Sequence, residues 1–178
     1  FADAVGLIDA MTPALRLASE PLLMAGALSH RALGNLEKAR EYLEAVLGRN
    51  GRHYAAQLLL ASILVEAGEY PRALVMLESL QRVTPNEPTV LTMLGTVNLA
   101  RKQYAQAAEL FERAAVLNPT GEAVRELGFS QLALGQDKLG LANLEKAFAR
   151  NNSDLRAGIQ LATIYARQGQ NNKAVQIA

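Results

Sequence analysis

Apolar and small residues recur along the chain at intervals of three and four, the spacing that places side chains on one face of an α-helix. In the segment 88–120, Leu91 and Leu94 mark one such face, and Ala107 and Phe111 mark a second. Two amphipathic helices joined by a short turn are therefore predicted for this segment. The same pattern returns before and after it, which predicts an all-α protein.

The two-helix pattern repeats with a nearly constant period. One series of small residues comprises Ala27, Ala61, Gly95, Gly128 and Ala162, in steps of 34, 34, 33 and 34. A second series in the same steps comprises Ala39, Ala73, Ala107, Gly140 and Ala174. Small side chains let neighbouring helices approach closely, so both series predict helix contacts.

A third series comprises Gly34, Gly68, Lys102, Gly135 and Gly169. Glycine after the last turn of a helix adopts the left-handed conformation without a Cβ penalty, so this series predicts the turn between the two helices. Lys102 breaks the series and is expected to cost about 1 kcal/mol if it adopts that conformation.

The three series divide the chain into repeats. The expected boundaries are 20–53, 54–87, 88–120, 121–154 and a truncated 155–178, with residues 1–19 as the remnant of a preceding repeat. Pro85 and Pro119 fall where second helices close, because proline does not continue a helix. In the leading segment Pro13 would interrupt a second helix, so a helix ending near Met11 is expected.

The repeat at 88–120 resembles the tetratricopeptide repeat, with Leu-Gly in the first helix, alanines around an aromatic residue in the second, and a closing proline. The residues that carry the resemblance are Leu94, Gly95, Tyr104, Ala107, Phe111, Ala114 and Pro119. It implies a right-handed superhelical solenoid of helix-turn-helix repeats whose first helices line a concave groove for a peptide or partner helix. It implies no reaction.

The chain departs from this pattern in places. Gly26 replaces the usual leucine, and Gly140 replaces an alanine. The common tyrosine of the first helix is replaced by His30, Asn98 and Gln131. These departures are expected to weaken packing without changing the fold.

Runs within the second helices resemble more narrowly the repeat lipoproteins that accompany bacterial PEP-CTERM protein sorting and exopolysaccharide loci. The runs are 42–47, 108–114 and 141–147. This resemblance implies a membrane-anchored parent protein in the periplasm. The chain starts at Phe1 and stops within a helical pattern, so we expect a piece of a longer protein that can self-associate through uncapped ends.

Charge and composition narrow the partners. Lys and Arg total 18 against 17 for Asp and Glu, giving a net charge of +1. This balance provides no general field for nucleic acid and, with a 34-residue period, disfavours the RNA-binding pentatricopeptide class. The longest apolar-rich stretch, 55–65, is far below the roughly 20 residues that span a bilayer, so no direct membrane insertion is expected. The absence of cysteine excludes disulfides and thiolate chemistry but leaves the compartment open.

No catalytic residue, metal site or cofactor is expected. The two histidines, His30 and His53, lie 23 residues apart without a carboxylate at metal-ligand spacing, and His30 is expected to be a part-buried packing residue. Paired carboxylates such as Glu122 and Glu126 lie on amphipathic helices and are expected to be solvated. No glycine-rich phosphate-binding motif occurs, so nucleotide binding is not expected.

The face of each first helix that would line the groove supplies the candidate binding residues. They are Thr92, Thr96, Arg125, Phe129, Arg156, Ile159 and Thr163. Two alternatives stay open: Phe129 and Ile159 pack against each other, and the arginines pair with Glu122 and Glu126 instead of a ligand carboxylate. We expect Phe129→Ala and Arg125→Ala to leave folding nearly intact while weakening partner binding.

The function that these observations favour is a non-catalytic protein-interaction scaffold. The alternative is a structural spacer or self-associating module that positions a neighbouring domain, and an unrecognised enzyme is the third possibility. The positions equivalent to the clamp with which some family members grip the C-terminal carboxylate of chaperones carry unsuitable side chains, including Leu58, Met93 and Glu122. The identity of the partner is not encoded in a recognisable motif.

Replacing Ala107 by leucine tests the assignment of the second small-residue series. The larger side chain should overpack the contact between helices and lower the free energy of unfolding by about 1–3 kcal/mol. Thermal and urea denaturation measure the change, and a melting temperature equal to that of the wild type would contradict the assignment.

Overall fold

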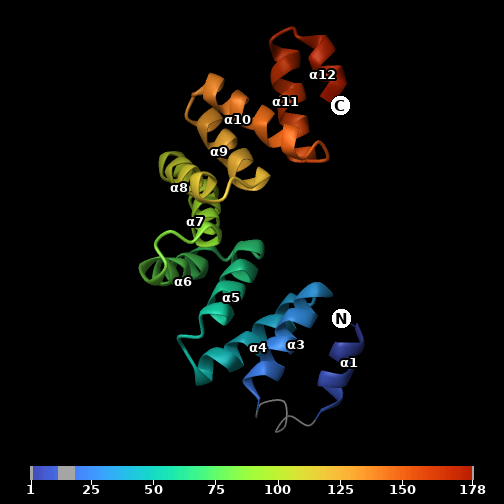
Figure 1. Cartoon of the computed structure of the whole chain (residues 1–178), viewed down its shortest axis with the longest axis vertical. Coiled ribbons are helices and arrows are strands. Elements are labelled where there is room, and N and C mark those ends of the chain that lie inside the picture. The colour runs from blue at the N-terminus through green and yellow to red at the C-terminus, as the bar shows by residue number, and fades with distance from the viewer. Residues whose placement is uncertain (1, 12–18, 178) are drawn as a thin grey trace. The chain divides into compact units, whose positions relative to one another are not determined.

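A computed structural model describes residues 2–11 and 19–177, and these residues form α-helices and no strand (Figure 1). The expected all-α fold, an array of helix-turn-helix repeats, is confirmed. The chain divides into two compact units, residues 1–80 and 81–178, which are described separately. Helix α6 (Tyr70–Val83) spans the boundary between them. No helix within the described residues is both long and apolar enough to cross a membrane.

The first unit contains α1 (Ala2–Ala10), α3 (Glu20–Ala32), α4 (Leu36–Arg49) and α5 (Tyr54–Glu66). Helix α1 ends close to the expected position, whereas Pro13 lies outside the described residues. Ile8 of α1 is buried, and Asp9 accepts hydrogen bonds from Lys38 Nζ at 3.3 Å and Tyr42 Oη at 3.1 Å. Apolar burial and a shared carboxylate thus join α1 to the α3–α4 hairpin.

The second unit contains three helix pairs. They are α7 (Pro88–Ala100) with α8 (Tyr104–Leu117), α9 (Gly121–Ala133) with α10 (Asp137–Arg150), and α11 (Leu155–Arg167) with α12 (Asn171–Ile177). The core passes from each pair to the next. Phe111 of α8 is buried with Leu127 of α9, and Leu144 of α10 is buried with Leu161 of α11. Each hairpin therefore buries its apolar face against its neighbour, as expected for a solenoid.

The small residues lie where helices approach closely. A Cβ atom on Gly95 would lie 2.7 Å from the Phe111 ring, and one on Gly140 would lie 2.9 Å from the carbonyl oxygen of Gly128. Ala107 is fully buried. The expectation that Gly140 weakens packing is therefore wrong, because glycine here permits a backbone approach that alanine would obstruct.

Polar side chains at the usual tyrosine position have local partners. His30 is 1% exposed and stacks on Tyr42 with ring centroids 5.4 Å apart. Asn98 Nδ2 donates to the carbonyl oxygen of Leu94 at 2.8 Å. Gln131 Oε1 accepts a hydrogen bond from Asn143 Nδ2 at 2.7 Å, which joins α9 to α10. The expected packing role of His30 is confirmed, and its burial is more complete than expected.

Helix α12 is held to the unit by one tyrosine. Tyr165 of α11 donates a hydrogen bond to Glu145 of α10, and the Lys173 ammonium of α12 lies 5.1 Å from the centroid of the Tyr165 ring. Burial, together with the neighbouring Glu145 carboxylate, raises the pKa of Tyr165 to about 12. The phenol therefore stays protonated at neutral pH and continues to donate to Glu145.

The turns between paired helices adopt the expected left-handed conformation. Gly34, Gly68, Gly135 and Gly169 have φ between 72° and 77°, and Lys102 has φ 61°. Lys102 is the only residue other than glycine with positive φ within the described ranges 2–11 and 19–177. The backbone of the array thus imposes the same turn even where the sequence provides a side chain that disfavours it.

Replacing Lys102 by glycine should stabilise the protein. A left-handed residue other than glycine costs roughly 1–2 kcal/mol, whereas the added flexibility of glycine in the unfolded chain removes about 0.5–1 kcal/mol of this gain. We expect a net gain of about 0.5–1 kcal/mol in urea denaturation. Lys102→Ala is the control and should give little change, because alanine carries the same Cβ penalty. Equal stability of the glycine and alanine variants would contradict this explanation.

Candidate partner-binding site

The starts of α9 and α11 are fixed by side-chain caps. Thr120 Oγ1 accepts a hydrogen bond from the backbone N–H of Ala123 at 3.3 Å, and Asp154 Oδ1 accepts one from the N–H of Ala157 at 3.1 Å. Each cap satisfies a backbone donor that has no partner within its helix. The candidate residues Arg125 and Arg156 follow these caps directly, so their backbone positions are well defined.

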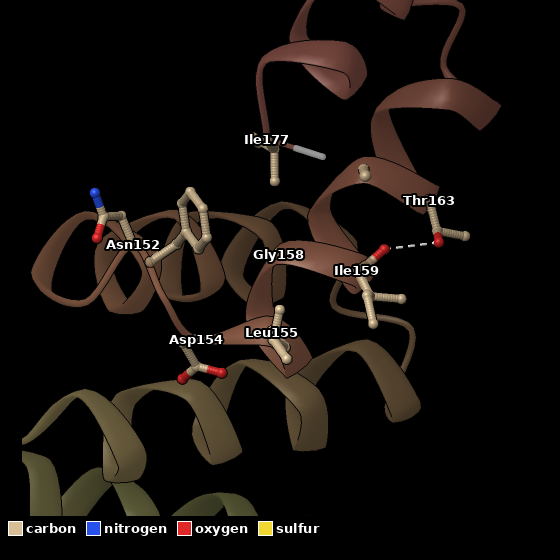
Figure 2. A pocket seen from close by; sticks show the side chains of 9 residues that line it. Asn152, Asp154, Leu155, Gly158, Ile159, Thr163 and Ile177 are labelled. Carbon is tan, nitrogen blue, oxygen red and sulfur yellow. Dashed lines mark hydrogen bonds between the residues drawn. The ribbon is translucent and has the colours of Figure 1, made fainter.

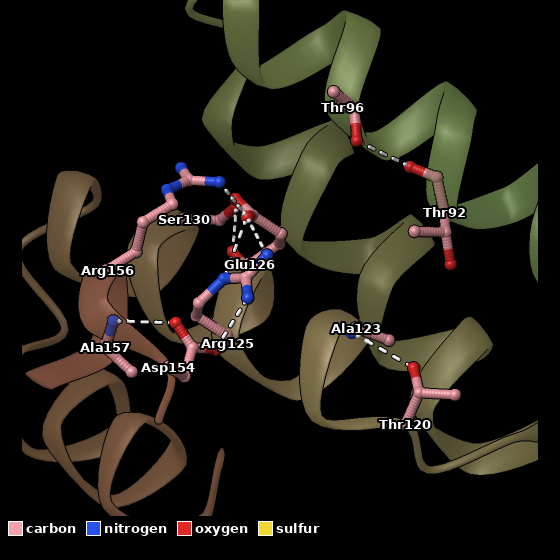
Figure 3. A network of polar contacts seen from close by, with 10 residues as sticks. All are labelled: Thr92, Thr96, Thr120, Ala123, Arg125, Glu126, Ser130, Asp154, Arg156 and Ala157. Atoms are coloured by element: carbon pink, nitrogen blue, oxygen red, sulfur yellow. Dashed lines mark hydrogen bonds and ion pairs between the residues drawn. The ribbon is translucent and has the colours of Figure 1, made fainter. Parts of the chain in front are cut away.

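Four charged side chains link α9 to α11, and we refer to Arg125, Glu126, Asp154 and Arg156 as the arginine network (Figure 3). Arg125 Nη1 donates to Asp154 Oδ2 at 2.6 Å, and Arg125 Nη2 donates to Glu126 Oε1 at 2.9 Å. Arg156 Nη1 donates to the same Glu126 oxygen at 2.7 Å. Two cations and two anions thus form a network with no net charge.

Exposure within the arginine network is uneven. The side chains of Glu126 and Asp154 are 6% and 8% exposed, and that of Arg125 is 15% exposed. The side chain of Arg156 is 64% exposed. The carboxylates are therefore enclosed by protein, and the charge presented to solvent is a guanidinium.

The arginine network shifts the pKa values of its members toward the ionised forms. Burial alone would raise the pKa of Asp154, but the hydrogen bonds from Arg125 and from the N–H of Ala157 outweigh it and hold this pKa below its usual value. Burial would lower the pKa of Arg125, and the hydrogen bonds to Asp154 and Glu126 more than reverse this effect. Both groups are consequently charged at neutral pH.

Two expectations change here. Glu126 was expected on a solvated helix face, but it is buried on the inner side of α9, whereas Glu122 is exposed. Arg125 pairs with Asp154 and Glu126 and is not positioned to receive a ligand carboxylate. Removing the Arg125 side chain would leave two enclosed carboxylates short of a partner, so Arg125→Ala should affect folding as well as binding.

Phe129 and Ile159 have different surroundings. Phe129 is partly buried and packs against the cluster of Leu144, Leu161 and Tyr165. The Arg156 guanidinium lies 5.2 Å from the centroid of the Phe129 ring, within the range of a cation–π contact. Ile159 is 68% exposed and is not part of that cluster. The outward apolar residue of this pair is therefore Ile159.

The three candidate threonines use their hydroxyl protons within their own helices. Thr96 Oγ1 donates to the carbonyl oxygen of Thr92 at 3.0 Å, and Thr163 Oγ1 donates to that of Ile159 at 2.7 Å. Thr92 and Thr96 are half-buried on α7, and Thr163 is exposed on α11. The structure brings Arg125, Phe129 and Arg156 into contact, while Thr92 and Thr96 form a separate group.

A cavity of about 400 Å³ lies beside α11 (Figure 2). Its lining comprises Phe148, Asn152, Asp154, Leu155, Gly158, Ile159, Ala162, Thr163 and Ile177. Two candidate residues, Ile159 and Thr163, belong to it, and the sequence analysis did not identify the others. The capping position of Asp154 before α11 is a readable signal, but the convergence of α10, α11 and α12 on one cavity is not.

The histidines have structural positions in the first unit. His53 Nδ1 accepts a hydrogen bond from the N–H of Ala56 at 3.1 Å and so caps α5, and His53 Nε2 lies 3.2 Å from Glu20 Oε1. His30 Nε2 lies 3.4 Å from Asp9 Oδ1. Within the part of the chain that the structure describes, no three His, Asp or Glu side chains are grouped to hold a metal ion.

This arrangement of capped helix pairs, left-handed turns and buried small residues defines a helical-repeat protein of the tetratricopeptide type. Residues 30–95 match the family model of the tetratricopeptide repeat. No curated protein matches the chain.

Solved structures with the same fold extend over most of the chain. MamA 41-end from Desulfovibrio magneticus RS-1 is 20% identical with a TM-score of 0.75, covering 89% of this chain and 90% of that chain. TTC0263, a thermophilic tetratricopeptide-repeat protein of Thermus thermophilus, is 22% identical with a TM-score of 0.64, covering 82% and 80%. At these identities the likeness shows the fold alone. It does not bear on the narrower resemblance to PEP-CTERM lipoproteins.

Replacing Asp154 separates its two roles. Asparagine also caps helices well, so Asp154→Asn should keep the cap but lose the ion pair, at a cost of about 1–3 kcal/mol in the free energy of unfolding. Asp154→Ala should cost about 1 kcal/mol more, because the cap is lost as well. Urea denaturation at pH 7 measures both changes.

The pH dependence provides the control for this series. Because folding lowers the pKa of Asp154, its stabilising effect is present above the ordinary value of 3.8 and is lost as the pH falls through the folded-state pKa. The difference between wild type and Asp154→Asn should therefore shrink below pH 3.8. A difference that stays constant down to pH 2 would show that the ion pair is not its cause.

Proposed function

We propose that this protein is a non-catalytic protein-interaction scaffold that binds a peptide or partner helix on the first helices of its second unit. The observation that carries this proposal is the exposure of Arg156 and Ile159, which lie one turn apart on α11. A cation and a large aliphatic side chain on one exposed helix face are a suitable combination for partner binding. The tetratricopeptide type of fold supports the same function.

The arginine network makes this surface suitable for recognition because it limits motion. Glu126 holds the Arg156 guanidinium at 2.7 Å, and the Phe129 ring lies beneath it. Asp154 fixes both the start of α11 and its distance from α9. A partner would therefore meet side chains that are already ordered, which lowers the entropy cost of binding.

The chemistry of the same residues argues against acid–base catalysis. An effective general acid or base needs a pKa near the working pH. The pKa of Asp154 is held below its usual range, and the oxygens of this carboxylate already accept hydrogen bonds. We therefore assign these carboxylates to holding the helices together.

We further propose that the protein serves bacterial envelope protein sorting or exopolysaccharide assembly as part of a membrane-anchored parent. This rests on the second-helix runs 42–47, 108–114 and 141–147. The genes that flank the parent gene test it, since sorting or polysaccharide genes are expected there and unrelated neighbours would contradict it.

Site-specific photo-crosslinking tests the binding surface. A photoreactive amino acid at Ile159 or Thr96 should crosslink a partner in cells that express the parent protein, and the same residue at the exposed Val116 of α8 should not. With the identified partner purified, Ile159→Ala and Phe129→Ala should each weaken binding about tenfold, and Val116→Ala should have no effect. Equal binding by all three variants would favour a structural spacer instead.

A further inference from the structure

The cavity beside α11 is bordered by apolar side chains that the fold does not cover. Phe148 of α10 and Ile177 of α12 line it, and Leu155 and Ile159 at its rim are 77% and 68% exposed (Figure 2). Large aliphatic side chains that are exposed together are uncommon on monomeric surfaces and often mark contact sites. This surface is therefore suited to an apolar group of a partner.

A glycine keeps the cavity open. A Cβ atom on Gly158 would lie 3.2 Å from the Phe148 ring and 3.7 Å from Ile177 Cγ2, so a side chain at this position would extend into the space between them. The volume of about 400 Å³ falls within the usual range of ligand pockets. It accommodates a large apolar side chain.

The charge beside the cavity is positive toward solvent. Glu126 and Asp154 are 6% and 8% exposed and already accept hydrogen bonds from the arginines, whereas Arg156 is 64% exposed. A guanidinium has five N–H donors, and the contacts within the described residues use one of those of Arg156, that on Nη1. The remaining donors are oriented by the bond to Glu126 and by the Phe129 ring, which favours a carboxylate as their partner.

We propose that this site, as part of the proposed binding surface, recognises an acidic segment of a partner protein that places one large apolar side chain in the cavity and one carboxylate on Arg156. Arg156 and Ile159 are three residues apart on α11, about 5–6 Å between their Cβ atoms. The partner's apolar and acidic residues therefore lie one helical turn apart, or two residues apart in an extended segment.

Selection from a random peptide library displayed on phage tests this proposal while the partner is still unidentified. Peptides selected on the purified chain should combine a Leu, Ile or Phe with an Asp or Glu at one of these spacings. Selection on Arg156→Glu should replace the acidic residue by Lys or Arg. Selection on Arg167→Glu, the matched control at the other end of α11, should return the wild-type motif.

Binding of one selected peptide, measured by fluorescence anisotropy, provides the quantitative test. Arg156→Gln and Ile159→Asp should each weaken it at least about tenfold, and Arg167→Gln should leave it unchanged. All of these positions are exposed, and circular dichroism with a urea titration checks that each variant is folded. A charge preference that does not reverse in Arg156→Glu would overturn the proposal.

The outcomes separate this inference from the proposed function. Selected peptides that lack an acidic residue, but lose affinity in Phe129→Ala, would overturn the inference and leave the scaffold function supported. The absence of any selected peptide would count against both.

Two further measurements exclude other occupants of the cavity. Concentration-dependent self-association in ultracentrifugation that Ile159→Asp abolishes would identify a second copy of the chain as the occupant. Loss of peptide binding in a version extended by native sequence would identify the same chain as the occupant. Either result would overturn the proposal.

Discussion

Burial of each helix hairpin against the next is the interaction on which the rest of this structure depends. A single hairpin has too little apolar surface to compensate for the conformational entropy of ordering it, so adjacent hairpins must share a core. Phe111 with Leu127 and Leu144 with Leu161 are buried in this way. Such burial requires close approach of the backbones, and therefore glycine or alanine where the helices meet, as at Gly95 and Gly140.

This requirement explains why the fold could be predicted from the sequence. Every repeat meets the same constraint, so the same residue type returns at the same phase and becomes visible as a period. The turn series illustrates this well, because Lys102 could be assigned a left-handed conformation solely from its place among glycines. Gly140 shows the limit, since its pattern marked a departure but did not show that the backbones come closer there.

The candidate site was predicted only in part, because it depends on contacts between successive repeats. Phe129, Arg156 and Ile159 could be selected from the helical phase. The burial of Glu126 could not, since it requires two arginines from different helices to converge on one carboxylate. A solvated glutamate and a buried one look identical in a sequence that contains many charged helix faces. The cavity beside α11 was not predictable for the same reason, because three helices form it.

The double role of Asp154 has a consequence for local motion. One oxygen of its carboxylate caps α11, and the other binds Arg125 of α9. Helix ends usually fray independently, but the first turn of α11 cannot open without also disturbing a contact of the neighbouring hairpin. Fluctuations of the two hairpins are thereby coupled, and their amide protons should exchange with solvent as one cooperative unit. A single carboxylate thus transmits order from one repeat to the next.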